Sequence, residues 1–246
     1  MKHLTIIAAL LAMAAPAFAQ DAMPPDAPAG AEKVEVSSIK DPELLPYRRM
    51  LRGLDAWEQK RALAPQADLR FELWTGDGKP AATEGLQLRI AGDTVDIALP
   101  LDADGTFVLP RSQAAFDDRA DLVSNRKKGE IRWRPRVRTP GVPENARRLG
   151  DLRLECEVGV AVRKEDIPLL YRAGAAAAGG LCRVPMVAYP YRAPRRLASA
   201  TVVSGAHKAA LPLYLGGAAY MAPLRDKSWD DDALVVYEFA EVSATP

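Results

Sequence analysis

Histidine and cysteine are scarce in this chain of 246 residues, which has two of each. One of the histidines, His3, falls in an N-terminal leader, so His207 is the one that remains after it. This shortage argues against zinc sites built from Cys and His and against His-dependent catalysis. The sequence also lacks the Gly-x-Ser-x-Gly, His-Glu-x-x-His and Gly-x-Gly-x-x-Gly motifs. We therefore expect no catalytic residue, no metal site and no cofactor.

The chain has no strong excess of charge of either sign. It carries 33 Lys and Arg against 32 Asp and Glu, for a formal net charge of +1. Removal of the leader takes Lys2 away and leaves a formally neutral chain. Neutrality argues against a nucleic-acid partner. Two carboxylates that meet only in the folded chain stay open, so a carboxylate-based hydrolase acting on envelope glycans is one candidate function.

Long apolar runs are absent beyond the first residues of the chain, which are typical of a signal peptide. Lys2 supplies a positive start, Leu4 to Ala15 is apolar, and Ala17 and Ala19 are the small residues that cleavage requires. The apolar stretch is too short for a mature transmembrane anchor. We predict a signal peptide over residues 1–19 with cleavage after Ala19, a periplasmic or secreted protein, and no transmembrane segment in the mature chain.

Cys156 and Cys182 are the two cysteines of the sequence. An isolated pair in an exported protein is more often a disulfide than two free thiols. Their spacing is unlike the Cys-x-x-Cys of redox-active pairs. We predict a structural disulfide between them.

The first folded element is predicted to be a helix. Residues 20–40 are rich in Pro, Ala and Asp without apolar periodicity, which predicts a disordered linker. Asp41 and Pro42 then form a good helix start, and apolar residues from Leu44 to Trp57 fall on one broad helical stripe. The predicted N-terminal helix covers residues 41–65. A start only at Pro46 stays open, because Pro46 and Gly53 weaken the helix.

From residue 68 the pattern changes to alternation of apolar and polar residues, which predicts short antiparallel strands. The alternating runs are Leu69, Phe71 and Leu73, then Leu86, Leu88 and Ile90, then Val95, Ile97 and Leu99, then Phe107 and Leu109. Leu149 to Val162 also has strand-like alternation around Cys156, whereas Arg163 to Ala178 predicts a helix that Gly179 breaks. The expected fold class is mainly β, α+β overall.

The segment from Leu99 to Pro110, with the sequence LPLDADGTFVLP, follows two alternating runs and has a turn at Asp102 to Gly105. It resembles the hairpin of carboxypeptidase-regulatory-like and transthyretin-like β-sandwich modules, over about residues 66–125. The resemblance implies Ig-like or prealbumin-like sandwich units, and it carries no catalytic residues to this chain. The whole chain is also similar to exported bacterial proteins, which implies a location and no activity.

The sequence resembles itself in two places. Ala98-Leu99-Pro100-Leu101 recurs as Ala210-Leu211-Pro212-Leu213, at an offset of 112 residues. At an offset of 113, Phe107, Pro110, Phe116, Asp117, Asp118, Ala120 and Val123 then match Tyr220, Pro223, Trp229, Asp230, Asp231, Ala233 and Val236. Chance similarity and true duplication both stay open. We expect a first β-sandwich unit over residues 66–140, a disulfide-closed connector over 141–182 and a second unit over 183–246.

Four arginines alternate with other residues between positions 131 and 139. Arg132, Arg134, Arg136 and Arg138 would share one face of an extended strand, and Pro135 places that strand at a sheet edge or at an irregularity. An exposed row of guanidinium groups suits phosphate, carboxylate or sulfate. The other interpretation is internal pairing, for which the acids considered are Asp117, Asp118, Asp121 and Asp230 to Asp232.

Taken together, these patterns predict a non-enzymatic exported protein with a binding or structural role. The candidate ligands of the arginine-lined face are an anionic envelope polymer, a lipid headgroup or an acidic protein. The carboxylate-based hydrolase remains the alternative.

Overall fold

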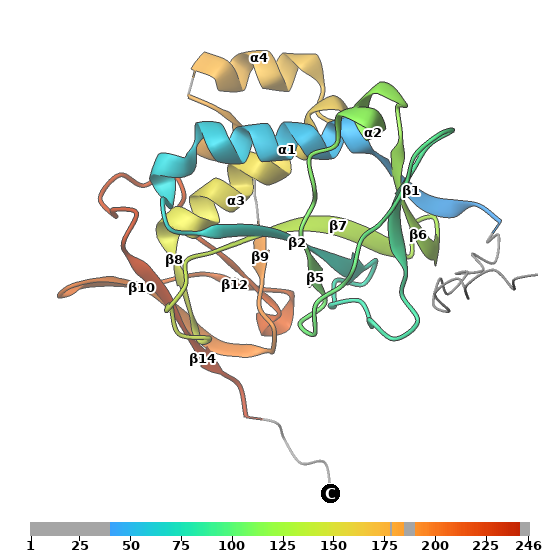
Figure 1. Ribbon diagram of the computed structural model, residues 1–246. Helices are drawn as coiled ribbons and strands as arrows, with labels where there is room; N and C mark the ends of the chain where they lie inside the picture. The colour runs from blue at the N-terminus through green and yellow to red at the C-terminus, as the bar shows by residue number, and fades with distance from the viewer. Residues whose placement is uncertain (1–39, 178, 185–189, 242–246) are drawn as a thin grey trace, which may run out of the picture. The chain divides into compact units, whose positions relative to one another are not determined.

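Figure 1 shows the computed structural model, which describes residues 40–177, 179–184 and 190–241. The predicted signal peptide and the predicted linker up to residue 39 lie outside these residues. The described chain belongs to one compact unit, Ser37–Pro246. It is mainly β, with four antiparallel sheets and few helices. No helix in the described ranges is long and apolar enough to cross a bilayer.

The first half of the chain forms two sheets. Its strands are β1 Pro42–Pro46, β2 Asp68–Thr75, β3 Leu88–Ala91, β4 Asp96–Ala98, β5 Thr106–Phe107, β6 Asp121–Lys127 and β7 Ile131–Arg138. The four-stranded sheet has the order β1-β6-β3-β4, and the three-stranded sheet has the order β5-β2-β7. The predicted alternation after residue 68 is therefore confirmed in β2 to β5.

The second half also forms two sheets. Its strands are β8 Ala146–Arg148, β9 Pro190–Arg192, β10 Leu197–Ser204, β11 His207–Ala210, β12 Leu213–Tyr214, β13 Ala219–Met221 and β14 Leu234–Phe239. The four-stranded order is β11-β10-β14-β8, and the three-stranded order is β12-β13-β9.

The helices lie mainly between β1 and β2 and between β8 and β9. The α-helices are α1 Tyr47–Gln59, α2 Gln113–Asp117, α3 Leu149–Val162 and α4 Leu169–Ala177. The short 3-10 helices are η1 Arg61–Leu63, η2 Lys164–Asp166, η3 Leu181–Arg183 and η4 Leu215–Gly217. The predicted helix over 163–178 is confirmed over Leu169–Ala177 as α4, before Gly179, a residue with φ +84°. Its predicted start at Arg163 was wrong, because η2 and Pro168 precede the helix.

The predicted start of the first helix near residue 41 was wrong, and the alternative start at Pro46 agrees with the N-cap of α1. Residues Pro42–Pro46 form strand β1, which pairs with β6, and the helix begins only at Tyr47. The residue before a proline is disfavoured in the α conformation, so Leu45 resists helix formation because Pro46 follows it. Pro46 itself keeps an extended ψ of 124°. The apolar stripe predicted further on does face inward, with Tyr47, Met50 and Leu54 buried.

The prediction of strand-like structure over Leu149 to Val162 was also wrong, because this segment is helix α3. Leu154 and Val158 lie in the hydrophobic core of the first half, whereas Leu149 and Leu152 lie in that of the second half. Because α3 contacts two cores, its apolar residues lie on more than one side and form no single stripe. Its polar residues Arg153, Glu155 and Glu157 also alternate with apolar ones, which is the pattern typical of a strand. The position of α3 between two cores thus explains the missed periodicity.

The two halves share the same strand pairing. In the first half, Arg89 of β3 pairs with Ala98 of β4 and with Val123 of β6. In the second half, Thr201 of β10 pairs with Ala210 of β11 and with Val236 of β14. The offsets between these partners are the 112 and 113 residues found in the sequence. The internal similarity therefore corresponds to equivalent positions in the two four-stranded sheets.

The equivalence reaches beyond the residues that the sequence comparison matched. Each half begins with a strand that leads directly into a helix, β1 into α1 and β8 into α3. The first helical N–H groups make matching contacts, since Tyr47 N donates to Ala120 O at 3.0 Å and Leu149 N donates to Ala233 O at 2.7 Å. The second half thus takes in β8 and α3, which the sequence assigned to the connector 141–182.

The aromatic pairs of the three-stranded sheets match as well. Phe71 pairs with Phe107 across β2 and β5, and Tyr191 pairs with Tyr220 across β9 and β13. In both pairs the ring centroids lie 5.8 Å apart.

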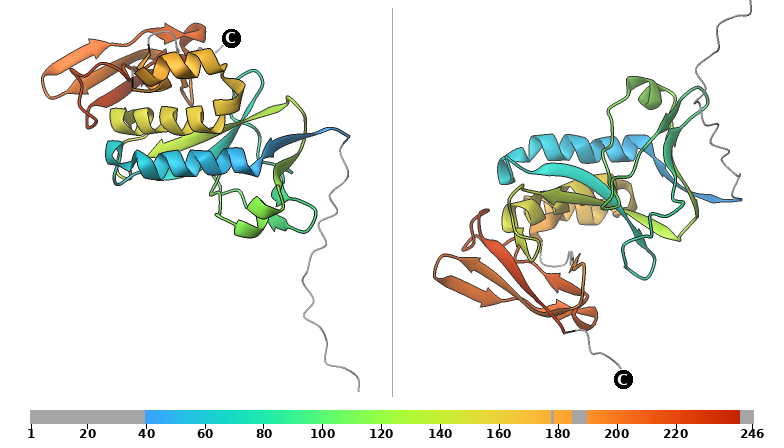
Figure 2. Two further views of the ribbon diagram at one scale, coloured as in Figure 1. Left: turned by 90° about the horizontal axis from the view of Figure 1, so that it is seen from above. Right: turned by 60° about the horizontal axis from the view of Figure 1, so that its bottom comes forward.

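Helices α1 and α3 lie side by side in both views of Figure 2. Gly53 makes this close approach possible, because a Cβ atom at that position would come within 2.7 Å of Val162 Cγ2. Ordinary side chains at Gly53 would push the two helices apart.

The turn at Asp102 to Gly105 connects two sheets. Gly105 adopts φ +74°, which favours glycine, and Gly105 N donates to Asp102 O at 2.9 Å. The strands on either side do not pair with each other, because β4 belongs to the β1-β6-β3-β4 sheet and β5 to the β5-β2-β7 sheet. The segment that resembles a sandwich hairpin therefore crosses from one sheet to the other.

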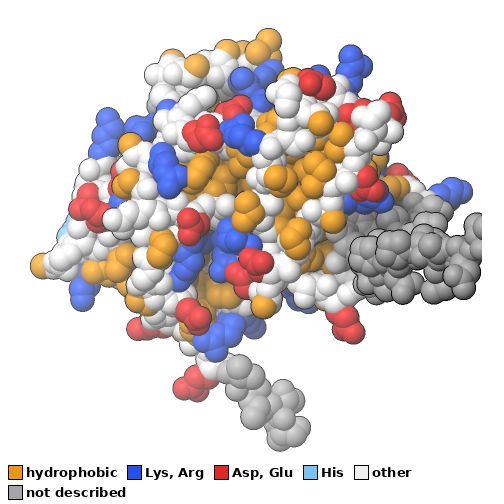
Figure 3. All heavy atoms as spheres, viewed as in Figure 1, with side chains coloured by type: hydrophobic (Ala, Val, Ile, Leu, Met, Phe, Trp, Pro, Cys, Tyr) orange, Lys and Arg blue, Asp and Glu red, His pale blue; other side chains and the backbone are white. Residues whose placement is uncertain are grey.

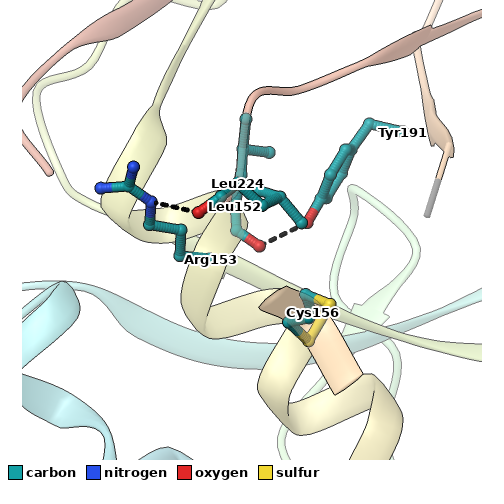
Figure 4. Close-up of a disulfide and its surroundings, with 6 residues drawn as sticks. Leu152, Arg153, Cys156, Tyr191 and Leu224 are labelled. Atoms are coloured by element: carbon teal, nitrogen blue, oxygen red, sulfur yellow. Dashed lines mark hydrogen bonds between the residues drawn. A yellow bond between two sulfur atoms is a disulfide. The ribbon is translucent and has the colours of Figure 1, made fainter. Parts of the chain in front are cut away.

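The predicted disulfide is confirmed. Cys156 on α3 is bonded to Cys182 in η3, with the Cα atoms 6.0 Å apart (Figure 4). Both cysteines are buried. The bond closes a loop that contains α4 and holds its far end against α3.

We predict that reduction of this disulfide lowers the free energy of unfolding by about 3–4 kcal/mol, because it releases a loop that spans a sequence separation of 26. Denaturant unfolding with and without a reductant measures the change. A Cys156→Ala/Cys182→Ala variant should show the lowered stability without reductant. A loss below about 1 kcal/mol would contradict the prediction.

Candidate anion-binding face

The four predicted arginines lie on β7, and the structure places them together. β7 pairs with β2 along its whole length, so Arg132, Arg134, Arg136 and Arg138 lie opposite Trp74, Glu72, Arg70 and Asp68. Alternate residues of a strand share a face. We call Arg70, Arg132, Arg134, Arg136 and Arg138 the arginine face. Asp68, Glu72 and Trp74 of β2 lie on the same side of the sheet, with Glu72 opposite Arg134. The predicted edge position of β7 is confirmed for its own sheet, since it is the last strand in the order β5-β2-β7.

Sequence reasoning missed Arg70 as a member of this face. The signal was present in β2, where Asp68, Arg70 and Glu72 alternate with apolar residues. Their pairing with β7 depends on the register between the two strands, which the sequence does not give.

One end of the arginine face offers guanidinium groups without acidic partners. Arg132 is exposed, and the guanidinium carbon of Arg134 lies 5.2 Å from the ring centroid of Trp74. Neither arginine has an ion-pair partner among the residues that the structure describes. Stacking on an indole orients Arg134 and leaves its N–H edge able to donate to a ligand.

The other end is neutralised in part by the turn between β4 and β5. Arg70 and Arg136 lie directly opposite each other, which is unfavourable for like charges. Asp104 accepts a hydrogen bond from Arg136 at 2.6 Å, and Asp102 pairs with Arg70. Although burial opposes it, hydrogen bonding from Thr106 and Arg136 lowers the pKa of Asp104. Basic and acidic side chains are interspersed on the face seen in Figure 3.

These partners differ from the acids considered in the sequence. Asp117 accepts from Gln113, and Asp118 accepts from the N–H groups of Thr94 and Val95. Asp231 and Asp232 pair with Arg153 and Arg148. The acids that pair with the arginine face are instead Asp102 and Asp104, from the turn at Asp102 to Gly105. This turn is distant from β7 in sequence, so local patterns did not predict that the two lie together.

A small cavity of about 220 Å³ opens at this end of the face. Its charged lining consists of Asp68, Arg70, Asp104, Arg136 and Arg138. Arg138 donates to the carbonyl oxygens of Val142 and Pro143 at 2.9 and 2.8 Å. Its pKa is lowered by burial and by repulsion from Arg147 and Arg136. An anion in the cavity would relieve that repulsion.

The free edge of β7 is covered by two acidic side chains of α3. Val137 N donates to Glu155 Oε2 at 3.1 Å, and Thr139 N donates to Asp151 Oδ2 at 2.8 Å. Four residues of helix rise about 6 Å, and two residues of strand rise about 6.6 Å. Acids at an i, i+4 spacing on the helix therefore match N–H groups at an i, i+2 spacing on the strand.

A buried ion pair completes this contact. Arg147 Nη2 donates to Glu155 Oε2 at 2.7 Å and to Val137 O at 2.9 Å. Burial works against the charge on Arg147, but the Glu155 carboxylate overcomes it and holds the pKa of the guanidinium well above its ordinary value. Below the pair, the hydroxyl groups of Tyr220 and Tyr237 are hydrogen-bonded at 2.6 Å, and burial raises both of their pKa values.

Glu72 is a second carboxyl group near this pair. It accepts a hydrogen bond from Trp74 Nε1 at 2.6 Å. Burial, followed by repulsion from Glu155, raises its pKa. Neither Glu72 nor Glu155 is among the residues that line the cavity over the arginine face. Glu72 and Glu155, which repel each other, therefore lie outside the lining of this cavity.

The remaining residues considered for catalysis have structural contacts. His207 stacks on Trp229, with the ring centroids 3.9 Å apart, and Ser204 Oγ donates to Asp230 at 3.2 Å. Within the described ranges, no three or more His, Cys, Asp or Glu side chains are grouped to hold a metal ion.

We predict that Glu155→Gln destabilises the protein by about 3–5 kcal/mol, because the amide still accepts from Val137 N but leaves Arg147 buried without a counter-charge. Chemical denaturation measures the loss. The control is Glu58→Gln, which removes an exposed partner of Arg111 and should cost less than about 1 kcal/mol. Equal effects of the two substitutions would contradict the role given to the buried pair.

Glu72→Gln should raise the melting temperature by a few degrees at pH 7.5 relative to the wild type. Because the pKa of Glu72 is raised on folding, the folded state holds its proton more tightly, so wild-type stability falls as pH rises from the ordinary glutamate range through the raised pKa. The advantage of the variant should shrink toward pH 4, where the carboxyl group is protonated in both states. A difference that is independent of pH in thermal melts would contradict this prediction.

No protein-family model matches this chain, and searches of curated proteins and of solved structures likewise return no similar protein.

Proposed function

We propose that this protein is a non-enzymatic exported binding protein that recognises an anionic polymer of the cell envelope through the arginine face. The observation that carries the proposal is the pair Arg132 and Arg134, which have no acidic partner among the described residues. Guanidinium groups donate in a planar fork that fits phosphate, sulfate and carboxylate groups. Unpaired arginines on an ordered strand are therefore suited to an external anion.

The spacing of the arginines favours a polymer over a single small anion. Alternate residues of a strand are separated by about 6.6 Å, so the row from Arg132 to Arg138 extends over about 20 Å. The cavity beside Arg136 and Arg138 would take one anionic group, and Arg134 and Arg132 would meet further groups along an extended chain. A repeating anion uses all of these positions together.

The buried carboxyl groups support binding over hydrolysis. Glu155 is committed to Arg147 and Val137, and Glu72 accepts from Trp74. A glycosidase needs one carboxylic acid and one carboxylate that both face the sugar. On the arginine face, the carboxyl group of Glu72 is held by the indole N–H of Trp74, and the other charged groups there include five guanidinium donors.

The disulfide supports the proposed location. Disulfides persist in oxidising compartments such as the bacterial periplasm. The bond between Cys156 and Cys182 therefore fits export by the signal peptide proposed for residues 1–19.

The test is binding of the purified, oxidised mature protein to dextran sulfate, with neutral dextran as the reference. We expect binding to dextran sulfate that weakens steeply with added salt. Arg132→Gln/Arg134→Gln should weaken it about tenfold, or about 1.4 kcal/mol. The melting temperature should fall only slightly, because neither side chain has an internal ion pair to lose and the variant gives up only the stacking of Arg134 on Trp74.

The matched control is Arg195→Gln/Arg196→Gln. This variant removes the same charge from two exposed positions, and Arg195 also stacks on an aromatic ring, that of Phe239. It should bind like the wild type. Equal binding by both variants, or no binding to the polyanion at low salt, would overturn the proposal.

A further inference from the structure

The outer surface of helix α4 is apolar and unusually exposed. Leu169 is 71% exposed, Leu170 is 82% exposed and Tyr171 is 54% exposed. Ala175 is the buried residue of this helix. In Figure 1, α4 lies at the top, outside the pair formed by α1 and α3, and the surface there is drawn mostly in white and orange in Figure 3.

The outward side of α4 carries no polar side chain. Successive residues of a helix are about 100° apart. The half of the helix opposite Ala175 is therefore formed by Leu169, Leu170, Ala173, Gly174, Ala176 and Ala177. A helix that faces water normally has its polar residues on this side.

Helix α1 follows that rule. Its buried stripe includes Met50 and Leu54, and its outer side carries Arg48, Asp55 and Glu58. The chain thus places charged residues on one surface helix and omits them from the outward side of α4. The contrast indicates that α4 meets something other than water.

Basic side chains without ion-pair partners in the described ranges lie next to α4. The two acids that precede it are neutralised by α1, since Glu165 pairs with Arg52 at 2.9 Å and Asp166 pairs with Arg49. A third acid, Glu157, interacts with Arg183 and Lys60. The neighbouring bases Lys164 and Arg172 have no ion-pair partner among the described residues. An apolar centre with unneutralised bases at its margin fits an anionic bilayer surface.

We propose that α4 docks this protein on the surface of an anionic lipid bilayer. Leu169, Leu170 and Tyr171 point in three directions about 100° apart. A fluid interface surrounds all three, whereas a rigid protein would need a pocket shaped around the end of the helix. The ring of Tyr171 suits the headgroup layer, and the exposed Lys164 has a long stem that suits contact with a lipid phosphate.

The disulfide anchors the segment that carries α4. It holds η3 to α3, and η3 in turn contacts α4. The helix therefore does not depend on its single buried alanine to stay in place. The exposed leucines are presented from a cross-linked scaffold.

The experiment is cosedimentation of the oxidised mature protein with vesicles of phosphatidylglycerol and phosphatidylcholine, and with vesicles of phosphatidylcholine alone. We expect binding to the anionic vesicles and much weaker binding to the neutral ones. Leu169→Ser/Leu170→Ser should reduce binding about tenfold or more, since two leucine side chains no longer enter the interface. Because both positions are exposed, the melting temperature should stay unchanged.

Two control variants make the result specific. Leu44→Ser/Val108→Ser alters exposed apolar residues elsewhere, 47% and 56% exposed, and should bind vesicles like the wild type. Arg132→Gln/Arg134→Gln should also keep vesicle binding, which separates this proposal from that for the arginine face. Unchanged binding by Leu169→Ser/Leu170→Ser would overturn the proposal. So would self-association through these leucines, seen by sedimentation velocity, without binding to vesicles.

Discussion

A buried ion pair between Arg147 and Glu155 holds the two halves of this protein in register. Arg147 comes from β8, Glu155 comes from α3, and both hydrogen-bond to Val137 of β7. Buried charges contribute little net stability when they are paired and cost several kcal/mol when they are not. The pair therefore acts mainly as a constraint on geometry, because the strand of one half and the helix of the other must meet at a single position.

The two halves share a pairing scheme but differ in the chemistry of their cores. Where the first half has Phe71 against Phe107, the second has Tyr191 against Tyr220. The added hydroxyl groups are hydrogen-bonded, that of Tyr220 to Tyr237 and that of Tyr191 to the carbonyl oxygen of Leu152. At equivalent positions, the phenylalanines thus give the first half an apolar centre. The tyrosines give the second half a polar centre next to the buried ion pair.

Local patterns predicted much of the secondary structure and the disulfide, and they failed where the surroundings decide. Alternation identified β2, because one face of that strand is buried. Alternation gave the wrong element for α3, which is enclosed by both cores. The helical stripe gave the wrong element for β1, because Pro46 keeps the helix from extending back past Tyr47. Four of the five arginines of the face were visible from their alternation along one strand. Arg70 and the neutralising Asp102 and Asp104 come from segments that only the fold brings together. The Ig-like or prealbumin-like assignment stays a prediction.

The covering of β7 has a consequence for behaviour at high concentration. The N–H groups of Val137 and Thr139 are occupied by Glu155 and Asp151, and Pro135, which shares their edge, has no N–H to offer. Three successive positions on the outer edge therefore present no donor to a strand from another molecule. The acidic side chains of α3 and Pro135 thus cover this edge, and a covered edge resists pairing with a strand of another molecule and the aggregation that follows from it.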